Sequence, residues 1–340
     1  MIEIDGSEGG GQWIRTALCL STVTGKPFKM DNIRGLRDKP GLKTQHLKGL
    51  NAVAELCNAR IEGNYLGSKK IEYYPGEING NKLDVRIETA GSIGLLFQTL
   101  QIPVSQSDKS FEVNVNGGAT FGKWAPTIPY IRKVLLPNIE KLGVLAEINV
   151  SRHGFYPKGG ARVKMRVEPC GNFTPIELTE RDEGGVIKGI SVASEHLKNP
   201  GVAKRQALAA EEYLTKRNFD VDIDHEYVDT FCPGSGITLW YETGDSVLGS
   251  DSVGERGKSS EKVGREAARE IVSTIESNAP FDKYMADQIL TFLALATENG
   301  PSKIRVEKVT EHCRTNLFII EKFLPVKYSI QNKKIKIKDR

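Results

Sequence analysis

Apolar and polar positions follow two periods along this chain, and the two recur in a fixed order. Alternation with period two, as in Lys334-Ile335-Lys336-Ile337, predicts strands, and apolar residues spaced three or four apart predict amphipathic helices. One layout occurs three times: a helix start, an apolar-rich helix, a turn containing glycine, and then an alternating strand. The three stretches are residues 10–33, 90–118 and 286–309.

Each stretch is followed by a second amphipathic helix and a pair of strands. The second helices are predicted within residues 41–58, 126–143 and 313–323, and the strand pairs within 60–76, 146–169 and 326–338. The first two repeats begin about 80 residues apart, and the second and third about 195 apart. The excess of roughly 100 residues implies an inserted unit, which itself has the pattern β-α-β-β-β-α.

The predicted fold class is therefore α/β. Three tandem β-α-β-α-β-β repeats form a large domain that carries a smaller inserted α/β domain. We place repeats one and two in residues 1–180, the insert in 181–278 and repeat three in 279–340.

The composition is that of an ordinary globular protein. Hydrophobic residues make up 39% of the 340 residues, and no apolar run reaches the ~18 residues of a membrane span. The chain starts with a strand-like segment, so we expect no signal peptide, and the five cysteines form no CxxC pair. A reducing, cytoplasmic location is expected. The net charge of +4 does not by itself indicate a nucleic-acid binder, and the sequence leaves a homo-oligomer open.

Two glycine-containing segments raise the question of phosphate binding. "SVGERGKSS" has Ser252 where a P-loop requires its first glycine, so we interpret Lys258 as a solvated residue at a helix start. "DGSEGGGQWIR" leads from a predicted strand into a helix near Gln12, where free backbone N–H groups attract anions. Glu8 suits a magnesium ion that carries polyphosphate, and Arg15 follows one turn later. A simple glycine turn with surface charges remains the alternative.

Other polar side chains gather at predicted helix starts. The loop "RGLRDKPGLK" contains Arg34 and Arg37, whose forked N–H donors match phosphate, although a solubilising basic loop would look the same. If the repeats share a fold, Gln12, Gln98, Asp287 and His312 should converge on one cleft. His312 stands where a predicted strand meets a helix with apolar Leu317, Ile320 and Phe323.

Several motifs, taken in order, resemble the RNA 3′-terminal phosphate cyclase family. They are "DGSEGGGQ", "RGLRDKPGL", "TAGS", "HGFYPKGG", "YMADQ" and "EHCRTN", and the likeness runs from Asp5 to Val326. The resemblance implies a fold similar to three copies of the C-terminal domain of translation initiation factor three, plus an insert. It also implies the substrates ATP and an RNA with a 3′-phosphate end, and Mg²⁺ or Mn²⁺ as the metal.

The resemblance implies a role for each candidate residue. His312 would be the nucleophile that takes AMP from ATP, passes it to the RNA 3′-phosphate as RNA-(3′)pp(5′)A, and so allows closure to a 2′,3′-cyclic phosphate. This is nucleotidyl transfer of the ATP-dependent ligase class. Glu8 would bind the metal. The nucleotide pocket would contain Gln12, Arg15, Gln98, Tyr284, Asp287 and Gln288. The reacting phosphates and the RNA end would meet Arg34, Arg37, Gln45 and His46.

Two alternatives stay open at this point. Some proteins of this fold lack the histidine and act as RNA-processing or ribosome-assembly factors, and "EHCRTN" argues against that class here. The enolpyruvyl transferases have a related repeat architecture, but their carboxyvinyl transfer needs no histidine nucleophile. Transfer of label from ATP to the protein would separate these readings.

Overall fold

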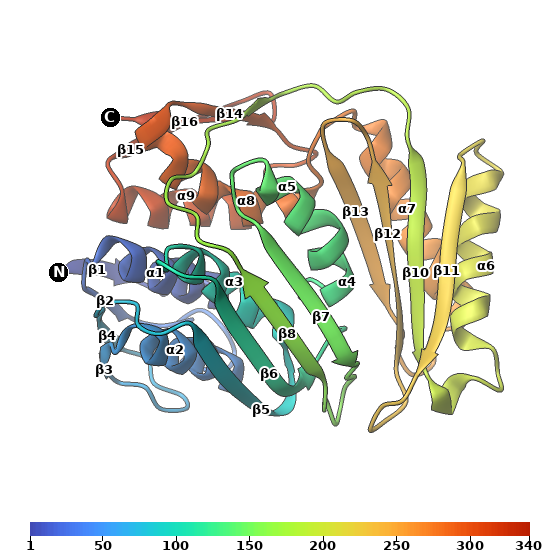
Figure 1. The fold of residues 1–340 in the computed structure, drawn as a ribbon, viewed down its shortest axis with the longest axis horizontal. Helices are drawn as coiled ribbons and strands as arrows, with labels where there is room; N and C mark the ends of the chain where they lie inside the picture. Colours follow the sequence, from blue (N-terminus) through green and yellow to red (C-terminus); the bar gives the residue numbers. More distant parts are fainter.

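The computed structural model describes all residues from Met1 to Arg340. Its helices and strands form four four-stranded sheets with helices packed against them, which confirms the predicted α/β class (Figure 1). Three of the sheets belong to one large body with a continuous core of 63 buried hydrophobic residues. The fourth sheet, coloured from yellow-green to orange in Figure 1, lies at the end of the molecule opposite both chain termini.

The first two repeats have the same strand order. Repeat one consists of β1 (Ile2–Asp5), α1 (Gly11–Thr24), β2 (Phe28–Asp31), α2 (Thr44–Cys57), β3 (Arg60–Glu62) and β4 (Ile71–Tyr74). Repeat two consists of β5 (Lys82–Ser92), α3 (Ile93–Ser105), β6 (Phe111–Ala119), α4 (Ile128–Tyr130), α5 (Leu136–Glu140), β7 (Ala146–Arg152) and β8 (Arg162–Val167). A π-helical turn, Ile131–Leu135, joins α4 to α5. The sheets run β1-β2-β4-β3 and β5-β6-β8-β7, each opening with a parallel pair.

The third repeat is split by the insert. Its sheet runs β15-β16-β14-β9, which is the same order read from the other side. The first strand, β9 (Glu177–Leu178), pairs in parallel with β14 (Ser302–Arg305) although more than a hundred residues separate them. The other elements are α8 (Lys283–Leu295), the 3₁₀ turn Ala296–Asn299, α9 (Glu311–Phe323), β15 (Val326–Gln331) and β16 (Lys334–Asp339). The insert therefore interrupts repeat three after its first strand.

The insert has its own sheet and core. It comprises β10 (Val186–Ser194), the 3₁₀ turn Glu195–Leu197, α6 (Val202–Thr215), β11 (Val221–Val228), β12 (Ser235–Glu242), β13 (Val247–Val253) and α7 (Ser260–Glu276). Figure 1 shows α6 and α7 covering one face of the sheet, where 13 residues such as Ile187, Leu239 and Ile271 are buried. The other face meets repeat two through two small clusters, which include Phe121 with Val192 and Tyr130 with Trp240.

Helices of all three repeats pack together in the middle of the large body. Helix α1 contacts α2, α3 and α9, and α8 contacts α9. In α9 the predicted apolar positions Leu317, Ile320 and Phe323 are all buried, which fixes the rotation of the helix about its axis. In the first turn of α9, Glu311 and His312 are exposed. None of the helices combines the length and the apolar character needed to cross a bilayer.

Candidate functional site

A cavity of about 800 Å³ lies where the helix bundle meets the insert. Its wall is built from the starts of α1, α2, α8 and α9, from Leu95 and Gln98 of α3, from the loop between β6 and α4, and from the end of β13 and the loop after it. The free N–H groups and the dipole of each helix start favour negative charge. Six basic and three acidic side chains line the cavity, which gives a formal surplus of three positive charges. The basic residues are Arg15, Arg34, Arg37, Lys43, Lys123 and Lys258. The cavity is therefore suited to anions such as phosphates.

The structure brings together nearly all candidate residues named from the sequence. The residues that line this one cavity are Gln12, Arg15, Arg34, Arg37, Gln45, His46, Gln98, Tyr284, Asp287, Gln288 and His312. The expected convergence of Gln12, Gln98, Asp287 and His312 is thus seen in the geometry. Glu8 is the exception: it is exposed and does not belong to the cavity lining, although Gly10, two residues later, does.

The glycine run at the start of α1 has two purposes. A Cβ on Gly9 would come within 2.6 Å of Trp13 Cδ2, and a Cβ on Gly11 would overlap Nε2 of His46. Gly10 and Gly11 both line the cavity, but only at Gly10 would a Cβ meet open space, with Arg37 Nη2 as its nearest neighbour at 3.8 Å. Two of the three glycines are therefore required for packing, and one allows a ligand to approach the backbone.

His46 is a buried, neutral histidine. The backbone N–H of Lys43 donates to its Nδ1 (3.1 Å), which leaves the proton on Nε2, the nitrogen that faces Gly11. Burial lowers the pKa of His46 to about 3, and the charges of Arg15, Arg34 and Lys43 act in the same direction. The ring therefore offers a hydrogen-bond donor rather than a positive charge in this part of the cavity.

The basic loop is held in shape by one of its own arginines. Arg34 has a backbone φ of 54°, and its Nη1 donates to the carbonyl oxygens of Lys39 and Gly41, both at 2.9 Å. Arg37 is exposed, and its guanidinium makes no hydrogen bond to the loop carbonyls of the kind that Arg34 makes. Arg34 thus orders the loop while lining the cavity, and Arg37 presents a free fork of donors to it.

His312 is the second residue of α9 and lies at the mouth of the cavity. Thr310 caps the helix by accepting from the backbone N–H of Cys313 (3.1 Å), so the imidazole is left free of the cap. The pKa of His312 is lowered from its ordinary value, first by burial of part of the ring and then by the charges of Arg15 and Arg37. A neutral imidazole beside two arginines is a nucleophile in a setting that stabilises anionic phosphate.

Asp287 organises the floor of the cavity. Its Oδ2 accepts from Gln12 Nε2 (3.2 Å), and its backbone carbonyl accepts from Asn316 (2.7 Å). Burial raises the pKa of Asp287 to about 7, against the opposing influence of Gln12 and of the Arg15 charge. Gln288 donates to the carbonyl of Tyr284 (3.0 Å), and its own buried Oε1 has no partner. A ligand with an N–H group would satisfy that oxygen.

The insert contributes side chains that sequence reasoning missed. Asp251, Ser252, Glu255 and Lys258 all line the cavity. The interpretation of Lys258 as solvated is wrong: its side chain is only 16% exposed, it donates to Ser252 Oγ (3.0 Å) and it pairs with Glu266. Burial raises the pKa of Asp251 to about 7. No local pattern could have indicated these residues, because they reach the cavity only through the docking of the insert.

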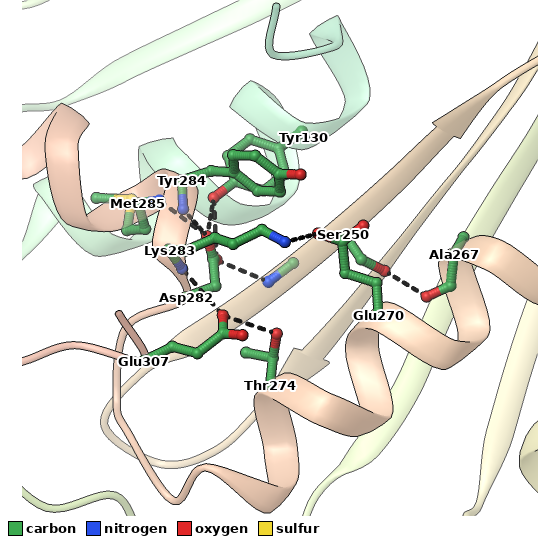
Figure 2. Close-up of polar contacts among 11 residues, drawn as sticks. Tyr130, Ser250, Ala267, Glu270, Thr274, Asp282, Lys283, Tyr284, Met285 and Glu307 are labelled. Atoms are coloured by element: carbon green, nitrogen blue, oxygen red, sulfur yellow. Dashed lines mark hydrogen bonds and ion pairs between the residues drawn. The ribbon is translucent and has the colours of Figure 1, made fainter. Parts of the chain in front are cut away.

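A polar network fixes that docking (Figure 2). The backbone N–H of Gly249, in β13, donates to Asp282 Oδ2 (3.0 Å), and Lys283 pairs with Glu270 of α7 (2.6 Å). Asp282 also caps α8 by accepting from the backbone N–H groups of Tyr284 and Met285, each at 2.8 Å. Tyr284, 43% exposed, therefore enters the cavity from a helix start that is tied to the insert.

No group of three or more histidine, cysteine, aspartate or glutamate side chains is arranged to hold a metal ion. Magnesium, however, is often bound by one or two carboxylates together with the phosphates of its substrate. Glu8, three residues before the start of α1, is exposed and lies outside the cavity lining, so its single carboxylate would suit only a metal that arrives with a polyphosphate. It does not fit a metal held by protein ligands alone.

The fold and the cavity define an α/β repeat protein with an anion-binding cleft made of helix starts. A family model described as RNA 3′-terminal phosphate cyclase matches residues 6–330. Proteins named RNA 3′-terminal phosphate cyclase from Caldivirga maquilingensis, Methanopyrus kandleri and Archaeoglobus fulgidus are 44%, 41% and 40% identical to this chain. These alignments cover 98–99% of this chain and 96–100% of the relatives.

The chain therefore belongs to the RNA 3′-terminal phosphate cyclase family, as its motifs indicated. This membership decides against the carboxyvinyl-transfer alternative.

Proposed function

We propose that this protein uses ATP to convert an RNA 3′-phosphate end to a 2′,3′-cyclic phosphate, with AMP carried on His312. The observation that carries the proposal is the position of His312: a neutral imidazole at the start of α9, opening onto a cavity with a surplus of positive charge. The names of the relatives support the overall reaction. The non-catalytic alternative has no observation in its favour.

The first step forms one bond and breaks another. A ring nitrogen of His312 attacks the α-phosphorus of ATP, and the bond to the β-phosphate oxygen breaks, releasing pyrophosphate. Negative charge grows on the transferring phosphate and on the leaving group, and Arg15, Arg37 and the helix starts can offset it. When bound, Mg²⁺ or Mn²⁺ supplies further neutralisation of the phosphates, and Glu8 is the side chain that would hold it.

The next two steps move AMP to the RNA and then release it. An oxygen of the RNA 3′-phosphate attacks the histidine-bound phosphorus, so the P–N bond breaks and RNA-(3′)pp(5′)A forms. The terminal 2′-hydroxyl then attacks the 3′-phosphorus, loses its proton, and AMP leaves. Arg34, Arg37, Gln45 and His46 line the same cavity and would hold the RNA phosphates. Gln288, whose buried Oε1 has no hydrogen-bond partner, would accept from an exocyclic amino group such as that of adenine.

The test is covalent labelling. The protein is incubated with α-labelled ATP and magnesium, and the label that stays on the denatured chain is counted. We expect acid-labile, alkali-stable label on the wild type and none on His312→Ala. His196→Ala is the matched control, because His196 is an exposed histidine in the insert and lies outside the cavity. Full labelling of His312→Ala would end the proposal.

A further inference from the structure

The most exposed large hydrophobic side chain of the protein lies at the mouth of the cavity. Trp124 is 89% exposed and belongs to the loop between β6 and α4. Lys123, Ala125 and Pro126, its neighbours in that loop, line the cavity with it. The other two tryptophans, Trp13 and Trp240, are 7% and 6% exposed. An indole in water is unfavourable, so its exposure beside the site calls for an explanation.

The backbone conformation of Trp124 also indicates a functional role for this residue. Its φ of 59° lies in the left-handed region, which costs free energy for a bulky residue. No burial of the side chain compensates that cost. The loop is instead held from the side: Lys123 Nζ lies 2.8 Å from Glu255 of the insert and 4.8 Å from the centre of the Trp124 ring. Strained, solvent-exposed positions of this kind are found where a ligand binds.

The surroundings indicate what kind of ligand this is. Arg37 and Lys43 lie on the wall of the same cavity, so phosphates are favoured beside an exposed aromatic face. Basic groups that follow a phosphate backbone, together with aromatic rings on which bases stack, are how proteins hold single-stranded nucleic acid.

A small ligand such as ATP needs walls that bury most of its surface. Trp124 offers only one open face at the rim, which suits a base whose chain is anchored elsewhere.

We propose that Trp124 is a stacking platform for one of the last bases before the 3′-phosphate of the RNA. This inference rests on the proposed function for the identity of the substrate. The Trp124 ring would fix the strand at its base, while Arg37 and its neighbours would hold the phosphates. The stack requires only an aromatic face, so binding is tolerant of base identity and is weakened when the base is missing.

Binding is measured without ATP, so that no reaction occurs. A short RNA ending in a 3′-phosphate is titrated into the protein while tryptophan fluorescence is followed. Stacking should quench the signal of Trp124, and the quenching should disappear in Trp124→Phe although that variant still binds. Trp124→Ala should weaken RNA binding by about 5- to 150-fold, the equivalent of ~1–3 kcal/mol per stacked base. Tyr156→Ala is the matched control, since Tyr156 is 80% exposed but outside the cavity.

Three RNAs, each lacking one of the last three bases, complete the test. One of them should bind the wild type more weakly than the intact RNA does. The affinity of that same RNA should not fall further when Trp124 is replaced by alanine. Three results would overturn the proposal. The first is that every abasic RNA loses the same affinity for the wild type as for Trp124→Ala. The second is that ATP alone quenches the tryptophan fluorescence, and the third is that Trp124→Ala changes the oligomeric state. The second would assign the ring to the nucleotide and the third to contact between copies. Labelling of His312→Ala would refute the proposed chemistry while leaving the RNA quenching in place.

Discussion

The hydroxyl of Tyr130 donates to the carboxylate of Asp282, its oxygen lying 2.8 Å from Oδ1 and 2.9 Å from Oδ2 (Figure 2). Tyr130 belongs to repeat two, Asp282 caps the first helix of repeat three after the insert, and Gly249 of the insert donates to the same carboxylate. One buried side chain thus joins three parts of the chain. Because Tyr284 follows Asp282 by two residues, this junction also sets where Tyr284 enters the cavity.

Tyr130→Phe should lower the free energy of unfolding by about 1–3 kcal/mol, because a buried carboxylate loses a hydrogen bond while the ring stays in place. The measurement is urea denaturation followed by circular dichroism. Tyr328→Phe is the control: that ring lies half-buried on β15, away from the junction, and its loss of a hydroxyl should cost less than about 0.5 kcal/mol. Equal losses in the two variants would show that the Tyr130–Asp282 bond does not hold the junction.

The pH dependence of adenylylation should report on His312. Its pKa is lowered by partial burial and by Arg15 and Arg37, so the neutral form persists below the ordinary histidine pKa of about 6.5. Protonation of His312 should therefore slow label transfer from ATP only below pH 6.5, whereas any effect of Asp287 or Asp251 should appear separately, near pH 7.

Arg37→Gln removes one of the charges that depress the pKa, so the midpoint of this profile should move to higher pH. Arg217→Gln, two residues beyond the C-terminal end of α6 and outside the cavity, should leave the midpoint where it is. The initial rate of labelling, measured across pH 5 to 9 in buffers of constant ionic strength, gives both midpoints. A profile that does not respond to Arg37→Gln would mean that this arginine does not act on His312.

The two arginines of the basic loop should respond differently to replacement. Arg37→Ala should lower the slope of log affinity against log salt for a single-stranded RNA by about 0.7, as expected when one phosphate contact is lost. Arg34→Ala should also release the carbonyls of Lys39 and Gly41, so the loop should become sensitive to protease. The control is Arg60→Ala, an exposed arginine of β3 that stacks on Tyr74. If Arg37→Ala and Arg60→Ala give the same slope, Arg37 does not contact RNA phosphate.

The repeat architecture could be predicted because it depends on local periodicity. Each unit shows the same succession of periods, and equivalent helix starts then fall together at the cavity. The period-two pattern does not reveal β9 as the first strand of repeat three, because two residues are too few to show alternation. Its partner β14 also lies beyond the insert.

Other parts of the site depend on contacts that are distant in sequence. The glycine run predicted a close approach of ligand to backbone, yet Gly9 and Gly11 make room for Trp13 and His46, which only the packed structure reveals. Asp251 and Lys258 become cavity residues through the docking of the insert. Their own segment resembles a P-loop that lacks its first glycine. Trp124 has no periodic signal at all. Burial, exposure and backbone strain are properties of the fold, so these residues could not be found from the sequence.

The last prediction concerns the division of work between protein and substrate. Once AMP is attached to the RNA 3′-phosphate, the nucleophile for ring closure is the 2′-hydroxyl of the terminal ribose. That hydroxyl is held by the sugar ring within reach of the phosphorus, so closure gains from proximity and needs no further protein nucleophile. A strand whose last nucleotide is 2′-deoxy but carries a 3′-phosphate should therefore be adenylylated and then stop. Mass spectrometry of the product should show an end heavier than the substrate by one adenylate, whereas the all-ribose strand should end lighter by one water. Release of AMP from the deoxy strand without a stable adenylylated end, or adenylylation of a strand ending in a 3′-hydroxyl, would contradict the proposed order of steps.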